Sequence, residues 1–188
     1  MPSSYRIELN KWLSQLDVEA NRVLDIGGSQ LPIKGRVKLF AVDEYIIADL
    51  PVPHAESPKP DIEIDLNLPA HNMPQQYFDL IFCLEVFDYI YDPKTAFQTI
   101  ASCLEPKGTV WITFPSVYPL HQPIEDDALR YMPGGIKKLA QACGLEIVKM
   151  LPRRPETNKW QEFFYAERMR GAKHQDHNFT GWIVELRK

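Results

Sequence analysis

Seven short apolar runs constrain the fold of this chain more than any other feature of its sequence. They cover residues 23–26, 45–48, 62–64, 78–83, 109–114, 145–150 and 181–186. Near-continuous apolar runs of this length are typical of parallel strands, because helices cover such strands on both faces. Strands that alternate with helices join into one sheet through crossover connections. The sequence therefore predicts an α/β fold with a Rossmann-like, mostly parallel sheet of seven strands.

Three stretches between or before these runs have the spacing of helices. They cover residues 4–16, 92–104 and 133–143, in which apolar residues recur at intervals of three and four. Asp92 is suited to cap the second helix, and Pro93 suits its first turn. Gly144 follows the third helix at the position where a C-terminal cap is expected.

Length and composition narrow the class of protein. The 188 residues are enough for one domain. We expect it to span residues 1–188, with an N-terminal helix within 1–20 and a helical or loop insertion at 151–179. The net charge of −4 argues against a dedicated nucleic-acid-binding protein. No run approaches the roughly 18 apolar residues of a membrane span. The three cysteines are isolated in the sequence, which fits a reducing, cytoplasmic location.

Proline is unusually frequent, with 16 residues against 9 glycines. Average usage is about 5% proline and about 7% glycine. Seven of the prolines follow the first three predicted strands: Pro32, Pro51, Pro53, Pro58, Pro60, Pro69 and Pro74. Proline disfavours a helix interior by about 3 kcal/mol. We therefore expect loops, or very short helices, in the crossovers after strands one to three.

Acidic residues mark the ends of the first three strands. Asp25 lies in the first strand, Asp49 follows the second and Asp65 follows the third. A Gly27-Gly28-Ser29 turn follows the first strand, where glycine lets a ligand approach the backbone closely. Ligands of open α/β sheets bind at the carboxyl ends of the strands. A carboxylate there can accept hydrogen bonds from a ribose diol or an exocyclic amine.

An ordered set of motifs resembles the class I S-adenosylmethionine-dependent methyltransferases. The matching segments are residues 23–28, 45–49, 61–69, 77–90 and 104–108, and the resemblance extends to about Met150. In the fourth segment, Asp88-Tyr89 stands where many members have an acid-His pair. The resemblance implies the seven-stranded sheet of that family, with an antiparallel last strand, and S-adenosylmethionine as the cofactor.

The resemblance also implies a role for the turn after the first strand. The loop would run past the methionine part of the cofactor at Gly27, Gly28 and Ser29. Asp25 would hold this loop, or bind the amino group of the cofactor through water. The family usually has a third glycine two residues after the second, which this chain lacks. A strand-ending turn without a ligand remains the alternative for Gly27-Gly28.

The other cofactor contacts implied by the resemblance come from strands two to four. Asp49 would bind the ribose hydroxyls, and Asp65 with the Leu66 backbone would face the adenine. Leu84 and Glu85 would lie beside the methionine and the sulfonium. Acidic side chains suit a cationic cofactor. Asp65 has a second interpretation, as the cap of the next turn.

Two alternatives concern the choice of acidic residue and of cofactor. Asp43 competes with Asp49 for the ribose, because it also follows a strand-like run. We favour Asp49, since its preceding run is more apolar and richer in β-branched residues. A nicotinamide cofactor is disfavoured, because Ser29 and Pro32 occupy two positions at which the G-x-G-x-x-G fingerprint needs glycine.

The loop after the fifth strand holds the candidates for chemistry. His121 is the best candidate for a general base, with a surface histidine as the alternative. Tyr118, Arg130 and Tyr131 are candidates for the acceptor pocket. We expect transfer of a methyl group to a small-molecule or sugar acceptor. The alternative is a non-catalytic module of the same fold that binds the cofactor or a partner.

Residues 153–179 combine aromatic and cationic side chains. Such a segment is more often an amphipathic helix that covers the sheet or forms a homodimer contact than a nucleic-acid-binding surface. His174 and His177 lie here with Asp176, but without a further ligand cluster we expect no metal site.

Overall fold

The fold is described by a computed structural model, which covers residues 4–52, 57–154 and 179–188. A seven-stranded sheet runs through the molecule in the order β3-β2-β1-β4-β5-β7-β6. The strands are β1 (Asp17–Ile26), β2 (Leu39–Asp49), β3 (Ile62–Glu63), β4 (Phe78–Cys83), β5 (Leu104–Pro115), β6 (Glu146–Arg153) and β7 (Gly181–Arg187). Strands β1 to β5 pair in parallel, while β7 is antiparallel to both β5 and β6. The predicted mostly parallel sheet with an antiparallel last strand is confirmed.

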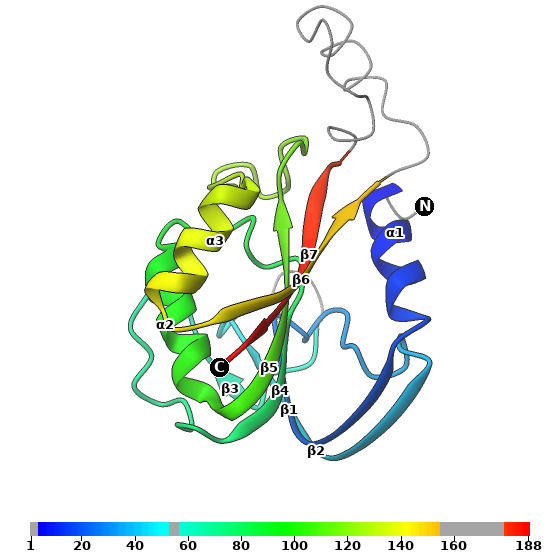
Figure 1. Ribbon diagram of the computed structural model, residues 1–188, viewed down its shortest axis with the longest axis vertical. Helices are drawn as coiled ribbons and strands as arrows, with labels where there is room; N and C mark the ends of the chain where they lie inside the picture. The colour runs from blue at the N-terminus through cyan, green and yellow to red at the C-terminus, as the bar shows by residue number, and fades with distance from the viewer. Residues whose placement is uncertain (1–3, 53–56, 155–178) are drawn as a thin grey trace, which may run out of the picture.

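Helices cover the two faces of the sheet unequally. Figure 1 shows α2 (Pro93–Cys103) and α3 (Pro133–Ala142) on one side of the sheet and α1 (Ser4–Leu13) on the other. The larger core lies on the side of α2 and α3, and it includes Phe87, Phe97 and Phe114. The smaller core lies under α1. Among the described residues, no helix is long and apolar enough to cross a membrane.

The three predicted helices form, with small differences at their ends. The side chain of Asp92 caps α2 by accepting a hydrogen bond from Thr95 N at 3.1 Å, as predicted. Gly144 follows α3 with a φ of +71°, the conformation that a terminating glycine supplies. Helix α1 ends at Leu13, three residues early. Leu16 O accepts a hydrogen bond from Lys38 N at 3.0 Å, so the chain is already turning into β1.

The proline-rich crossovers are loops. Residues 27–38, 50–52, 57–61 and 64–77 contain no helix in the described part of the chain. This confirms the prediction drawn from the proline excess. The loops, rather than helices, approach the carboxyl ends of β1 to β3, where they form the rim of the site described below.

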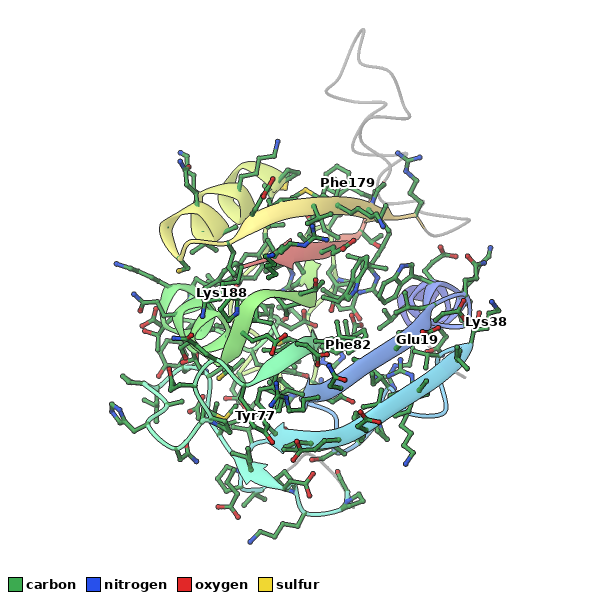
Figure 2. All side chains as sticks on the ribbon, turned by 60° about the horizontal axis from the view of Figure 1, so that its bottom comes forward. Glu19, Lys38, Tyr77, Phe82, Phe179 and Lys188 are labelled. Carbon is green, nitrogen blue, oxygen red and sulfur yellow. The ribbon has the colours of Figure 1, made fainter. Side chains whose placement is uncertain are left out.

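Strands β1 and β2 start six residues before the predicted runs. Their register extends from Asp17↔Leu39, whereas β4 joins β1 only at Val23. The first halves therefore form a two-stranded ribbon, whose burial alternates along the chain instead of being continuous. Figure 2 shows Glu19 and Lys38 at one end of this ribbon and Phe82 near the centre of the sheet.

Strand β5 includes the turn that the sequence places before it. Phe78 pairs with Leu104 and Leu80 with Thr109, so residues 105–108 loop out of the ladder. Lys107 takes a φ of +71° in this loop. A Cβ on Gly108 would lie 2.9 Å from Glu105 O, so the tight turn needs glycine there.

Candidate functional site

A cavity of about 320 Å³ opens at the carboxyl ends of β1, β2, β3 and β4. Strands β1 and β4 are neighbours in the sheet but lie on opposite sides of the point where the strand order reverses. Ligands bind at this switch point in open α/β sheets. Its described lining includes seven of the predicted site residues: Gly27, Asp49, Asp65, Leu66, Leu84, Glu85 and His121.

Gly27 forms the tight turn that carries the chain away from β1. Its N–H donates to Ala48 O at 2.8 Å, and its φ is +78°. A Cβ at this position would lie 2.4 Å from Val86 Cγ2. Both the conformation and the close approach therefore require glycine. This turn sets the shape of the cavity between β1 and β4.

Asp25 lies behind this turn and holds the loop that follows it. Its buried carboxylate accepts hydrogen bonds from Ile33 N at 2.9 Å and from the Tyr45 hydroxyl at 2.5 Å. Gly28 lies against the same carboxylate, where a Cβ would come within 2.6 Å of it. Burial raises the pKa of Asp25 to about 6. Among the described residues, Asp25 and Gly28 do not line the cavity. Their contacts instead anchor the loop after β1.

Asp49 presents a carboxylate at the end of β2. Its Oδ2 accepts from Ser29 N at 3.1 Å, and its Oδ1 accepts from Leu50 N at 2.8 Å. A carboxylate has about four lone-pair sites, so two remain for a ligand. Asp43 lies in the middle of β2 and is exposed. Of the two candidates, only Asp49 reaches the cavity. The buried Ser29 hydroxyl has no hydrogen-bond partner among the described residues.

The end of β3 brings Asp65, Leu66 and Asn67 to the cavity. Asp65 Oδ1 accepts a hydrogen bond from Asn67 N at 2.9 Å, so the turn-capping interpretation of Asp65 also holds. The Asn67 side chain ties this turn to the loop after β4, because its Oδ1 accepts from Tyr91 N at 2.8 Å. Asn67 lies within the matching segment 61–69, but its contacts are not predicted from that motif. Its role depends on tertiary contacts.

Glu85 is held in a fixed position beside the cavity. It has a φ of +59°, and its Oε1 accepts from the Thr113 hydroxyl at 2.9 Å. Arg153 Nη1 lies 2.6 Å from the same oxygen, and the Arg153 side chain is 4% exposed. This buried ion pair compensates the negative charge of Glu85. The sequence suggests that acidic side chains of the cavity attract a cationic cofactor. Because Arg153 neutralises Glu85, this attraction depends on the other carboxylates of the lining, Asp49 and Asp65.

Two arginines also contribute positive charge to the lining of the cavity. Arg6 comes from α1, and Arg36 comes from the loop between β1 and β2. The Arg36 guanidinium donates to Leu31 O at 2.8 Å and to Asn10 Oδ1 at 2.9 Å. Burial lowers the pKa of Arg36, and the charge of Asp25 opposes this shift. Neither arginine stands in a recognisable motif, because the fold alone brings them to the cavity.

His121 reaches the cavity from the loop after β5, together with Tyr89 and Gln122. The Tyr89 hydroxyl contacts His121 Nδ1 and donates to Gln122 O at 2.5 Å. The His121 backbone N–H donates to Asp127 Oδ2 at 2.8 Å. Tyr89 was not singled out by the sequence as a site residue.

The three predicted acceptor-pocket residues lie outside the described lining of the cavity. Arg130 forms a bidentate pair with Asp127, both contacts at 2.6 Å, and donates to Tyr118 O at 3.3 Å. It therefore braces the loop that carries His121. Tyr131 is buried against Phe114 and donates to Ile90 O at 3.2 Å. Its contacts are those of a core residue behind the cavity.

Asp88 is a buried carboxyl beside the site. Burial, with a smaller contribution from the charge of Glu85, raises its pKa to about 7 from 3.8. Between about pH 4 and pH 7, Asp88 is protonated in the folded state but ionised in the unfolded state. The free energy of unfolding therefore falls as the pH rises through this range. The effect is on the order of 2 kcal/mol between about pH 5 and pH 7.

We expect Asp88→Asn to reduce the pH dependence of stability, because the amide does not ionise, while the contribution of Asp25 remains. Urea unfolding at the two pH values measures it, and Asp126→Asn, at an exposed position, is the matched control. An Asp88→Asn protein with the pH dependence of the wild type would contradict the assignment.

Several predictions lie outside the described residues. They concern the segment 153–179, interpreted as an amphipathic cover of the sheet or a homodimer contact, of which residues 155–178 are outside the described part, and the pair His174 and His177.

Comparison with known proteins identifies the relatives of this chain. The family model described as a methyltransferase domain matches residues 5–150. No curated protein matches the sequence. An S-adenosylmethionine-dependent methyltransferase from Mesorhizobium loti is similar in structure, with a TM-score of 0.62 and 14% identity, covering 98% of this chain and 98% of that chain.

Two further structures are similar in fold. An S-adenosylmethionine-dependent methyltransferase from Archaeoglobus fulgidus gives a TM-score of 0.63 at 14% identity, with 99% of this chain and 95% of that chain covered. The cyclase SpnF gives 0.62 at 17% identity, with 98% and 80% covered. At these identities the structural matches show a shared fold, which the family model independently supports.

Proposed function

Because the chain belongs to the family of methyltransferase domains, we propose that it transfers a methyl group from S-adenosylmethionine to a small-molecule or sugar acceptor. One observation carries this proposal. The cavity at the switch point of the sheet is lined by Asp49, Asp65 and Glu85 from three strand ends, and by His121 from a fourth loop. We also propose that residues 1–188 form one domain, since every described strand belongs to one sheet.

The residues of the cavity suit S-adenosylmethionine in their chemistry. Asp49 retains two lone-pair sites for a ribose diol. Leu50, Ile64 and Leu66 supply apolar surface near Asp65, which suits an adenine ring with its exocyclic amine. Arg6 and Arg36 supply positive charge for the carboxylate of the methionine part. A volume of about 320 Å³ lies within the usual range of small-ligand pockets.

The cofactor, when bound, supplies a methyl group that its positively charged sulfur makes electrophilic. The protein must then position an acceptor atom, keep water away and remove a proton where the acceptor is a hydroxyl. Positioning contributes much of the acceleration of such a displacement. His121 lines the cavity and is the residue that can take up the proton. Gly27 and the fixed Glu85 also line the cavity.

We expect His121→Gln to lower methyl transfer by about 10²- to 10⁴-fold, because general-base catalysis contributes factors of that size. Cofactor affinity should change little, since His121 is assigned to the acceptor. Transfer from methyl-labelled S-adenosylmethionine to a panel of phenols, alcohols, sugars and a metabolite extract measures the effect. His71→Gln, at an exposed position on another loop, is the control. Equal transfer by both variants would remove His121 from the mechanism.

A non-catalytic module is the second candidate function. It is favoured by the absence of the family's third glycine after Gly28. The similarity in fold to the cyclase SpnF also shows that this architecture is found in a protein named for another reaction. Saturable cofactor binding without transfer to any acceptor of the panel is the result that this alternative predicts.

A further inference from the structure

Three polar atoms meet where the loop after β4 contacts the loop after β5. The Tyr89 hydroxyl contacts His121 Nδ1, and it lies 2.5 Å from Gln122 O. His121 Nδ1 also lies 3.0 Å from Gln122 O. All three residues line the cavity. The contacts therefore fix a protonation pattern at its wall.

The positions of the protons follow from counting donors. A carbonyl oxygen such as Gln122 O only accepts, while a tyrosine has one O–H proton. If the Tyr89 hydroxyl donated its proton to His121 Nδ1, neither the Tyr89 oxygen nor Nδ1 would have a proton left for Gln122 O. The carbonyl oxygen would then lie at hydrogen-bond distance from two other acceptors. The consistent pattern has the Tyr89 O–H donating to Gln122 O, and the His121 Nδ1–H donating to Tyr89 and Gln122. Nδ1 therefore carries the proton of the neutral imidazole, and Nε2 is bare.

The surrounding contacts hold the ring in this position. The His121 backbone N–H donates to Asp127, and Arg130 holds both oxygens of that carboxylate. The Tyr89 ring packs edge-on against the imidazole, with centroids 5.6 Å apart. Burial raises the pKa of Tyr89, so its hydroxyl keeps its proton across the physiological range. No hydrogen bond to His121 Nε2 is found in the described part of the chain.

We propose that Tyr89 is a positioning residue that holds His121 in the Nδ1–H tautomer, so that Nε2 is the base for an acceptor hydroxyl. The inference rests on the proposed function and deepens it, because it assigns the acceptor to the class of hydroxyl compounds. The hydroxyl proton passes to Nε2 while the oxygen forms its bond to the methyl carbon. The carbon–sulfur bond breaks, its electron pair stays on sulfur, and the imidazolium later releases the Nε2 proton to solvent.

Nitrogen NMR of the full-length protein labelled with ¹⁵N-histidine tests the tautomer without any acceptor. The His121 signals are identified by their loss in His121→Gln. In its neutral form, the wild-type ring should show Nδ1 protonated and Nε2 unprotonated. A wild-type ring protonated on Nε2 would overturn the proposal, whatever the outcome of the transfer assays.

Tyr89→Phe separates positioning from folding. It removes one of the two acceptors of the His121 Nδ1–H and leaves the Gln122 carbonyl. The share of the Nε2–H tautomer, which is preferred in free histidine, should therefore rise, and kcat should fall at least about tenfold with the cofactor Kd unchanged. Tyr91→Phe, at a position that is 66% exposed, should change neither property. An unchanged tautomer in Tyr89→Phe would overturn the role of Tyr89. Failure of the wild-type protein to bind S-adenosylmethionine would instead contradict the proposed function.

Discussion

Replacing Asp49 by alanine is expected to weaken S-adenosylmethionine binding by about 10²- to 10⁴-fold. Hydrogen bonds to a charged group contribute about 1.5–3 kcal/mol each, and Asp49 has two free lone-pair sites for the ribose hydroxyls. The substitution also removes the acceptor for Ser29 N and Leu50 N. The loop between β1 and β2 would thereby lose its link to the end of β2.

Calorimetric titration with S-adenosylhomocysteine, the demethylated product, measures this loss. Asp43→Ala is a closely matched control, because Asp43 lies on the same strand but is exposed at its middle. It should bind with the affinity of the wild type. Asp49→Asn should fall between the wild type and Asp49→Ala, since the amide keeps one acceptor oxygen. Wild-type affinity in Asp49→Ala, or an equal loss in Asp43→Ala, would contradict the assignment.

Gly27→Ala is expected to destabilise the fold by about 2–5 kcal/mol. A non-glycine residue with positive φ costs about 1–2 kcal/mol, and overpacking costs about 1–3 kcal/mol more. Here the added Cβ would meet Val86 Cγ2 at 2.4 Å. Val86 lines the cavity with Gly27, so the same change should distort the site and weaken cofactor binding.

Urea unfolding monitored by circular dichroism measures the loss of stability. Gly135→Ala is the control, because nothing lies within 4 Å of its added Cβ and alanine is the better helix former. It should be neutral or stabilising. Adding Val86→Ala to Gly27→Ala should recover the overpacking part of the loss and leave the backbone part. Equal stabilities of Gly27→Ala and the wild type would show that the turn does not require glycine.

The sequence predicts the strand ends and the loops of this protein. Continuous apolar runs mark the parts of the strands that helices or loops cover on both faces, and prolines mark the crossovers that have no helix. The sequence does not predict the first half of β1, and it indicates the first half of β2 only as a separate strand-like run before Asp43, because these halves form a two-stranded ribbon. Their burial alternates, so the apolar run that signals a parallel strand begins only at Val23 and Tyr45.

The site was predictable where it depends on strand ends, and it was not predictable where it depends on tertiary contacts. Asp49 and Asp65 reach the cavity because a residue after a parallel strand has a defined position in the fold. Arg153 and Tyr89 gain their partners from segments 68 and 32 residues away, which no local pattern reveals. Arg130 was selected for its charge, but Asp127 engages that charge within the loop.

The central claim is that the cavity at the carboxyl ends of β1 to β4 is an S-adenosylmethionine site. Calorimetry of the wild-type protein with S-adenosylmethionine, S-adenosylhomocysteine and NAD tests it most directly. The account predicts saturable binding of the first two ligands at one site per chain and no binding of NAD. Binding of NAD alone would contradict it.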